Sequence, residues 1–197
     1  MKRTWDRIHV WLAGHAPRVL ASLRPGATDE AIRAAEAELS ASLPDDVRAC
    51  YRIHDGQAAS ERLLGWAPSF LYGQEWYALE RVLDSWRVLK RLAGAGIFTR
   101  RRSQPDGPIR KEWWHPAWIP LTSDHTACHY CLDLAPLARG NVGQIILWQN
   151  DDPGRLLEAT SFRAWLDDFA DELEDGVWRT HPDYDGILPF DHVSDDE

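Results

Sequence analysis

Two dense segments, residues 43–56 and 118–146, constrain the fold of this chain more than any other feature. The first reads LPDDVRACYRIHDG, and the second contains the stretches WIPLTSD, CLDLAP and GQII. Both segments combine apolar residues with residues that favour turns and helix ends, as structural frameworks do. Neither segment contains a recognisable catalytic constellation. We therefore expect the function to lie on the surface of a scaffold, which favours a binding protein over an enzyme.

Helical spacing of apolar residues accounts for most of the first half of the chain and for its end. Thr4, Thr28 and Ser161 each precede such a stretch and are suited to cap a helix through the side-chain oxygen. Pro44 is suited to begin a helix, because the first turn does not need the missing N–H. Gly176 is suited to end one. The pattern predicts helices over residues 4–16, 28–39, 44–54, 79–94 and 161–175.

The second half of the chain favours β-structure. Strands are predicted over residues 118–121, 128–134 and 144–148, and strand-like character also occurs at residues 63–66 and 70–72. Consecutive strands joined by short turns pair antiparallel. We therefore predict one α+β domain over residues 1–176, in which an antiparallel β-sheet is flanked by N-terminal, central and C-terminal helices. Residues 177–197 are predicted to form an acidic C-terminal tail.

The formal charge of −9 is concentrated at one end of the chain. Residues 167–197 contain twelve acidic residues and one basic residue, giving −11, whereas residues 1–166 contain 21 basic and 19 acidic residues, giving +2. An acidic end repels nucleic acid and anionic lipid and favours a basic partner. We therefore expect a basic protein partner, no nucleic acid and no membrane. The same acids also fit a solvated helix face followed by a solubilising tail.

The N-terminal residues do not have the pattern of a signal peptide, because Asp6, Arg7 and His9 interrupt the apolar run. No stretch approaches the roughly 18 apolar residues of a membrane span. Three cysteines, two of them three residues apart, do not suggest a disulfide framework. We expect a cytoplasmic protein that is a monomer or a weak dimer.

A metal site is the sharpest chemical alternative in the sequence. His125, Cys128, His129 and Cys131 fall within seven residues and are ligand types that bind zinc. However, Cys128 and Cys131 have opposite parity on the predicted strand, so their side chains would point to opposite faces of the sheet. No second ligand pair follows at the usual spacing. We expect both histidines to be surface residues and the protein to hold neither a metal nor another cofactor.

The sequence offers no catalytic residues by motif. Ser123, Asp124 and His125 are adjacent, whereas a working triad brings together residues from separate parts of a fold. The chain contains no nucleophile elbow, no P-loop and no dinucleotide-binding glycine motif. We expect that the protein is not an enzyme.

Eleven tryptophans stand out in a chain of 197 residues. Four of them have the spacing of helix core positions, but five lie in predicted loops or strands, at positions 66, 76, 113, 114 and 148, and some of these five are expected to be exposed. Exposed aromatic and arginine side chains are typical anchors of protein interfaces. A basic loop around Arg101 has the same potential, although a solvated charge run explains it as well. The predicted partner-binding residues are Tyr72, Trp76, Arg101, Trp113, Trp114, Asp151 and Asp152.

The ordered series of these features resembles the Smi/Knr family of the SUKH superfamily. The resemblance rests on a Trp-bearing N-terminal helix, the 43–56 segment, a Trp-centred middle helix, the WIP, CLDL and GQI stretches and the final Phe162/Trp165/Leu166 helix. It extends from about Trp5 to Leu173. The family usually has glycines in the turn that follows the WIP strand, where this chain has Asp124-His125-Thr126-Ala127. The backbone geometry of that turn is therefore a point for the structure to resolve.

The resemblance implies a sheet flanked by helices and a role that is not enzymatic. Bacterial members of the superfamily are largely immunity proteins that bind and neutralise a cognate toxin. The fungal namesake is a cell-wall synthesis regulator. The main expectation is therefore a bacterial immunity protein that binds and neutralises a cognate polymorphic toxin, such as a nuclease or another toxin that targets nucleic acid. The alternatives are a regulatory or scaffold protein related to the cell-wall regulators and, third, a metal-binding enzyme.

Overall fold

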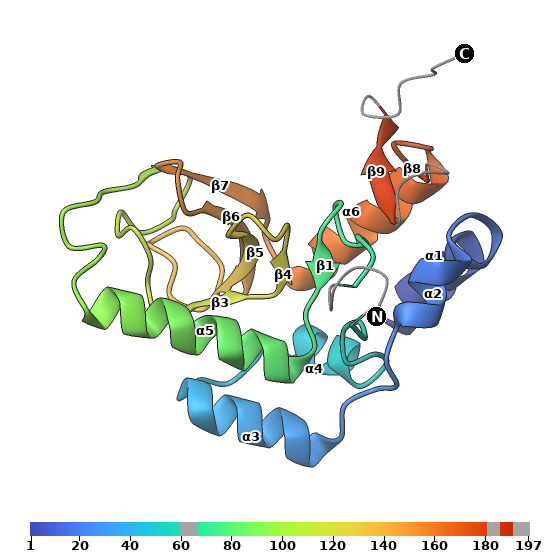
Figure 1. Ribbon diagram of the computed structural model, residues 1–197, viewed down its shortest axis with the longest axis horizontal. Helices are drawn as coiled ribbons and strands as arrows, with labels where there is room; N and C mark the ends of the chain where they lie inside the picture. Colours follow the sequence, from blue (N-terminus) through green and yellow to red (C-terminus); the bar gives the residue numbers. More distant parts are fainter. Residues whose placement is uncertain (60–66, 181–185, 191–197) are drawn as a thin grey trace.

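The computed structural model describes residues 1–59, 67–180 and 186–190 of the 197-residue chain. The strand-like stretch expected at residues 63–66, with Trp66, lies outside the described residues. Figure 1 shows helices and a sheet that form one α+β unit. The helices are α1 (Lys2–His15), α2 (Pro17–Ser22), α3 (Asp29–Leu39), α4 (Asp45–Tyr51), α5 (Leu79–Gly94) and α6 (Phe162–Glu174).

The helix ends follow local chemistry. The Thr28 side chain accepts a hydrogen bond from the Ala31 N–H at the start of α3, and the Ser161 side chain accepts one from the Ala164 N–H at the start of α6. Both caps confirm the sequence prediction. Thr4 is not a cap, because α1 already begins at Lys2 and Thr4 is buried within it.

The central sheet has five strands in the order β2-β7-β6-β5-β3. All neighbours pair antiparallel except β2 and β7, which are parallel. The sheet is therefore mixed, and the wholly antiparallel arrangement predicted from the sequence is wrong for this edge. The five strands are β2 (Gln104–Asp106), β3 (Trp118–Pro120), β5 (Cys128–Asp133), β6 (Gln144–Gln149) and β7 (Gly154–Ala159). Two small ladders complete the structure, one between β1 (Glu75–Trp76) and β4 (Thr122–Ser123) and one between β8 (Trp178–Thr180) and β9 (Ile187–Pro189).

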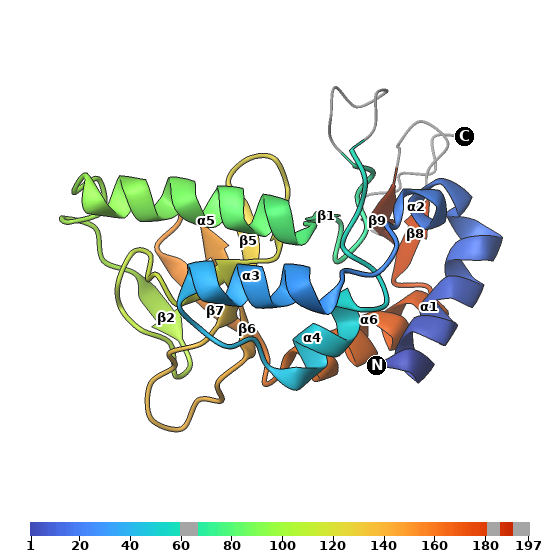
Figure 2. The same ribbon diagram turned by 90° about the horizontal axis from the view of Figure 1, so that it is seen from below.

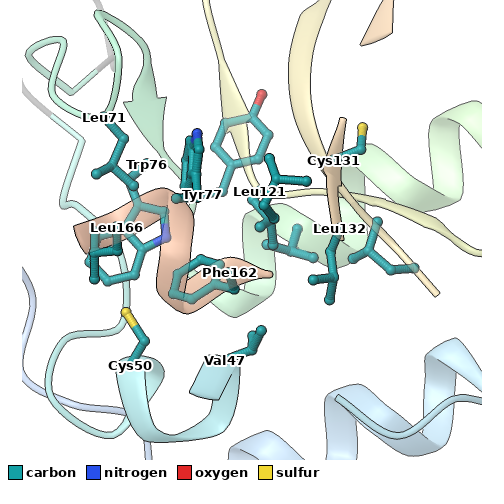
Figure 3. Close-up of a cluster of buried hydrophobic side chains, with 14 of the residues drawn as sticks. Val47, Cys50, Leu71, Trp76, Tyr77, Leu121, Cys131, Leu132, Phe162 and Leu166 are labelled. Atoms are coloured by element: carbon teal, nitrogen blue, oxygen red, sulfur yellow. The ribbon is translucent and has the colours of Figure 1, made fainter. Parts of the chain in front are cut away.

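Helices and an ordered loop cover the two faces of the sheet. On one face Tyr130 of β5 packs against Trp165 of α6, with 5.3 Å between the ring centroids. On the other face the Trp148 indole N–H donates to the Trp113 carbonyl, which lies in the loop before β3. Figure 2 shows α5 with α3 alongside it and α6 on the opposite side of the molecule. The core between these layers is apolar, and Figure 3 shows part of it, with Val47, Cys50, Trp76, Leu132 and Leu166 among the labelled side chains.

The 43–56 segment fixes three parts of the chain to one another. The Asp55 carboxylate accepts the Leu79 N–H at the start of α5, at 2.9 Å, and forms an ion pair with Arg24. The His54 ring bonds the Arg24 carbonyl, at 2.7 Å. Gly56 has φ 64°, and a Cβ at this position would lie 2.2 Å from the Ala78 backbone nitrogen, so only glycine fits. The segment is therefore structural, as the sequence predicted.

The turn after β4 has a backbone geometry that glycine adopts most easily. His125 and Ala127 have φ values of 65° and 68°, in the left-handed region that side chains with a Cβ seldom occupy. The Asp124 carboxylate holds the turn by accepting the N–H groups of Thr126 and Cys128. The turn therefore keeps the geometry of a glycine turn at the expense of two strained residues.

The segment after Gly176 does not behave as a separate tail. Trp178 and Ile187 are both buried in the hydrophobic core. The Ile187 N–H bonds the Ser69 carbonyl, at 3.0 Å, and the Ser69 hydroxyl bonds the Ile187 carbonyl, at 2.9 Å. The sequence prediction of an independent acidic tail over residues 177–197 is therefore wrong for the described residues 177–180 and 186–190. Among the described residues, none of the helices has the length and apolar character that crossing a membrane requires.

Candidate protein-interaction surface

Four of the predicted partner-binding residues meet where the loop before β3 contacts the turn between β6 and β7. The Arg101 guanidinium lies 4.8 Å from the centroid of the Trp113 ring and donates to the Asn150 carbonyl, at 2.9 Å. Asp151 and Asp152 follow Asn150 and are exposed. We call this region, formed by Arg101, Trp113 and residues 150–152, the Arg101–Trp113 surface.

A buried arginine, Arg155, holds the backbone of this surface in place. Arg155 of β7 is fully buried, and its guanidinium also lies 4.8 Å from the Trp113 ring, so two guanidinium groups flank one indole. Arg155 donates to the Trp113 carbonyl, at 2.8 Å, and to the Asp152 carbonyl, at 2.7 Å. Burial lowers the pKa of Arg155 to about 10, which leaves it charged at neutral pH. Arg155 therefore joins the loop and the turn into one unit.

The arrangement makes Arg101 the presented group and Trp113 its support. Trp113 is only 7% exposed, so it offers a partner little direct contact area. Arg101 is exposed and is held in place by the ring and by the Asn150 carbonyl. A pre-positioned guanidinium loses less side-chain entropy when it binds a carboxylate or a carbonyl group. Exposed basic residues on the segments before and after β2 and the acids of the turn give this surface a mixed charge; they are Arg100, Arg102, Lys111, Asp151 and Asp152.

The expected exposure is wrong for Trp76, Trp114 and Trp148, whereas Trp66 lies outside the described residues. Trp76 is 0% exposed and stacks on Trp5, with 5.4 Å between ring centroids. Trp114 is 4% exposed, and Trp148 is also fully buried. These indoles are the largest apolar groups of the chain, and the layers between helices and sheet bury them even where the sequence shows no helical spacing. Trp76 and Trp114 are therefore core residues, and their side chains are too buried for the predicted contact with a partner.

Tyr72 lies apart from the Arg101–Trp113 surface. It is half-buried, its ring stacks on Trp165 at a centroid distance of 5.0 Å, and its hydroxyl donates to the Trp165 carbonyl, at 2.9 Å. The Tyr72 and Trp178 rings are also in contact and perpendicular to each other, with 5.7 Å between centroids. The tyrosine therefore joins α6 to the β8–β9 hairpin.

The four residues considered as metal ligands do not converge. In β5 the side chains of Cys128 and Cys131 alternate to opposite faces of the sheet. His129 is buried, stacks on Trp148 and bonds the Thr122 carbonyl at 2.6 Å, so the expectation of a surface histidine is wrong for this residue. His125 is partly buried beside the Glu75 carboxylate, at 3.5 Å. In the described part of the chain, no three histidine, cysteine or acidic side chains are arranged to hold a metal ion.

The comparisons with known proteins agree with this scaffold. A profile of the SMI1 / KNR4 family (SUKH-1) matches residues 26–168. The chain is 31% identical to the Cell wall assembly regulator SMI1 of Saccharomyces cerevisiae, over 95% of this chain and 43% of that protein. It is 29% identical to the Cell wall biosynthesis/cell cycle regulator smi1 of Schizosaccharomyces pombe, over 93% of this chain and 38% of the relative.

A third relative has a related description. The chain is 26% identical to the Glucan synthesis regulatory protein of Neurospora crassa, over 91% of this chain and 40% of that protein. The chain therefore spans less than half the length of these fungal relatives. The matched family range includes Arg101, Trp113 and Arg155 but leaves out α1 and the β8–β9 hairpin.

Proposed function

Because this chain belongs to the SMI1 / KNR4 family (SUKH-1), we propose that it is a non-enzymatic regulatory protein that acts by binding another protein. The observation that carries the proposal is the similarity, over nine-tenths or more of the chain, to proteins named as regulators of cell-wall assembly or glucan synthesis. Those proteins are more than twice as long as the aligned part, so their complete activities are not transferred. The shared scaffold and its capacity to bind a partner are what we carry over.

The state of the nucleophile candidates supports a role without catalysis. Burial raises the pKa of Cys50 to about 12 and raises the pKa of Cys128 and Cys131. Their thiols are therefore protonated at neutral pH and are poor nucleophiles. The Ser123 hydroxyl accepts the His125 N–H, at 2.9 Å, so it serves the turn. The side chains that the sequence offered for chemistry thus have structural contacts.

The Arg101–Trp113 surface is the partner contact that we propose within the family core. It combines an exposed guanidinium, held at 4.8 Å from an indole, with two exposed carboxylates on a turn that Arg155 anchors. Complementary charges at such a rim mainly set association rate and specificity. A partner that presents both a carboxylate and a basic side chain fits this mixed surface.

The proposal is tested by affinity capture of partners with the whole chain from a lysate of its source organism, quantified by mass spectrometry. The key variant is Arg101→Glu, and its control is Arg33→Glu, which reverses an exposed charge on α3. We expect native protein and Arg33→Glu to capture the same partner and Arg101→Glu to capture at least about fivefold less, the effect of placing like charges at an interface. Equal capture by Arg101→Glu would contradict this surface. Absence of any captured protein would contradict the binding function itself.

The immunity function implied by the resemblance stays a prediction, and a separate readout distinguishes it. Cell-envelope or glucan-synthesis proteins among the captured partners support the regulatory role. A secreted protein with a toxic C-terminal domain, encoded beside this chain, supports the immunity role instead. In that case, co-expression of the chain must restore growth to cells that produce the toxin.

A further inference from the structure

Helices α1 and α6 lie side by side and run in the same direction, with a seam between them. The Thr4 hydroxyl donates to the Asp167 carboxylate near the start of both helices. One turn further, Arg7 forms ion pairs with Asp171 and Glu174, each at 2.6 Å. Figure 1 shows α1, the C-terminal part of α6 and the β8–β9 hairpin together at one end of the molecule. A cavity opens at each end of this seam, with the Arg7 bridge between the two.

The first cavity is cationic. It has a volume of about 280 Å³ and is lined by Met1, Arg3, Thr4, Arg7, Arg163 and Asp167. Asp167 already accepts from Thr4, and Arg7 is already paired with two acids. Arg3 and Arg163 are exposed, and neither side chain forms an ion pair or a hydrogen bond with any residue that the structure describes. Two guanidinium groups that face one cavity without internal partners suit a carboxylate or a phosphate, which each can bind in a bidentate manner.

The second cavity is aromatic. It has a volume of about 520 Å³ and is lined by Trp11, His15, Leu173, Glu174, Gly176, Trp178, Arg179 and Thr180. The Trp11 ring stacks on His15 with 4.6 Å between centroids, and the Trp178 indole N–H donates to Glu172, at 2.7 Å. Both indoles are thus fixed in orientation. Val10 and Val177, each next in sequence to a lining residue, are 77% and 45% exposed. Such a cavity suits a large apolar or aromatic side chain.

The two cavities are spaced for one short peptide. Arg3, Arg7 and Trp11 occur every fourth residue on α1, so they form one stripe along the helix. Eight residues of helix separate Arg3 from Trp11, a distance of about 12 Å at 1.5 Å per residue. An extended peptide covers about 12 Å with roughly four residues. A carboxylate at one position and an aromatic side chain about four residues away can therefore occupy both cavities at once.

We propose that the α1–α6 seam is a docking groove for an extended segment of a partner protein that carries an acidic residue and, about four residues away, an aromatic residue. The acidic residue binds between Arg3 and Arg163, and the aromatic residue packs between Trp11 and Trp178. This proposal rests on the proposed role as a protein-binding protein. α1 and β8 lie outside residues 26–168, the range that the family model matches, and the groove is separate from the Arg101–Trp113 surface.

The experiment measures binding of two fluorescein-labelled peptides by anisotropy. Each carries one glutamate and one tryptophan separated by three glycine or serine residues, one peptide for each order along the chain. A third peptide has lysine in place of glutamate and the same residue order as the glutamate peptide that binds. We expect the native protein to bind one of the two glutamate peptides, and to bind the lysine peptide at least about tenfold more weakly, because a charge-assisted hydrogen bond is lost and like charges meet.

Variants of the protein assign that binding to the groove. Arg163→Glu and Arg3→Glu should each weaken binding at least about tenfold, whereas Lys2→Glu, an exposed charge on α1 that does not line the cavity, should leave it unchanged. Trp11→Ala should also weaken it, and unfolding curves of each variant check that α1 is still docked. Arg163→Glu lies on α6, so its effect does not depend on α1 stability.

Three results would overturn the groove. They are no binding of either glutamate peptide, equal binding by Arg163→Glu, or self-association of the native chain that Trp11→Ala abolishes, which would assign the seam to a second copy. None of these results would contradict the Arg101–Trp113 surface, because that surface is tested separately by comparing partner capture by the native protein and by Arg101→Glu.

Discussion

The packing of Ile187 gives the sharpest test of the fold, because the sequence and the structure lead to opposite expectations for it. Ile187 is 0% exposed, and its backbone and Ser69 exchange hydrogen bonds across 118 positions of the chain. Ile187→Ala removes buried methyl groups and leaves a cavity, which costs about 2–5 kcal/mol. Against a total stability of about 5–15 kcal/mol, this is a large fraction.

The assay is urea unfolding followed by tryptophan fluorescence. With a slope of about 2 kcal/mol per molar urea, the midpoint should fall by about 1–2.5 M. The matched control is Val177→Ala, which lies on the same hairpin segment but is 45% exposed and should change stability by no more than about 0.5 kcal/mol. A change below about 1 kcal/mol for Ile187→Ala, or full cooperative unfolding of a chain that ends at Gly176 with an unchanged midpoint, would refute the docking of the hairpin.

Two further predictions concern the core and its pH dependence. Trp165→Ala or Leu132→Ala should each lower the free energy of unfolding by about 2–5 kcal/mol. A loss below about 1 kcal/mol would contradict the placement of these two side chains in the core. Burial and the neighbouring His54 lower the pKa of His9, whose Nε2 lies 2.7 Å from that of His54, so the unfolded chain binds this proton more readily. Stability should therefore fall as the pH drops below the unfolded pKa of 6.5 toward the lower folded pKa, and His9→Gln, which keeps a donor for His54, should flatten that fall. Identical slopes for native protein and variant between pH 7 and pH 5 would contradict it.

Five of the six described helices were predictable because their signals are local, whereas the short α2 (Pro17–Ser22) was not predicted. The caps at Thr28 and Ser161, the proline before α4 and the apolar face of α5 all act within one or two turns. Strands β5 and β6 were predictable for a related reason, since apolar residues alternate along the first and form a short run in the second. In these elements local preference and tertiary packing agree.

The elements that the sequence did not reveal depend on distant partners. β2 contains Pro105 and pairs in parallel with β7, and this pairing brings together residues about 50 positions apart. β9 contains only three residues within an acidic stretch, and its burial follows from contact with residue 69. Short strands of this kind have almost no pattern of their own, so a charge-rich composition led to the prediction of a tail.

For the candidate site, the sequence predicted correctly only the exposure of the charged residues. Arg101, Asp151 and Asp152 are exposed as expected, but Trp113 is their buried support. Arg155 was not found, because a single arginine in a strand of mixed burial looks like a solvent-facing residue in sequence. A buried guanidinium requires several carbonyl groups to converge on it, and only the fold brings those carbonyl groups together.

The division between framework and surface would allow a chain of a recognisable family to bind a partner of its own. The residues that carry the resemblance make contacts that any member with this scaffold needs: Asp55 begins α5, Gly56 allows a close backbone approach, and Asp133 accepts the Gln144 amide, at 2.9 Å. None of these side chains is available for a partner. We expect the recognition of a partner to come from loops on the framework, such as the one bearing Arg101, and from exposed side chains on its outer elements, such as α1 and the β8–β9 hairpin. These are also the parts of the chain in which a substitution can change the partner without unfolding the core.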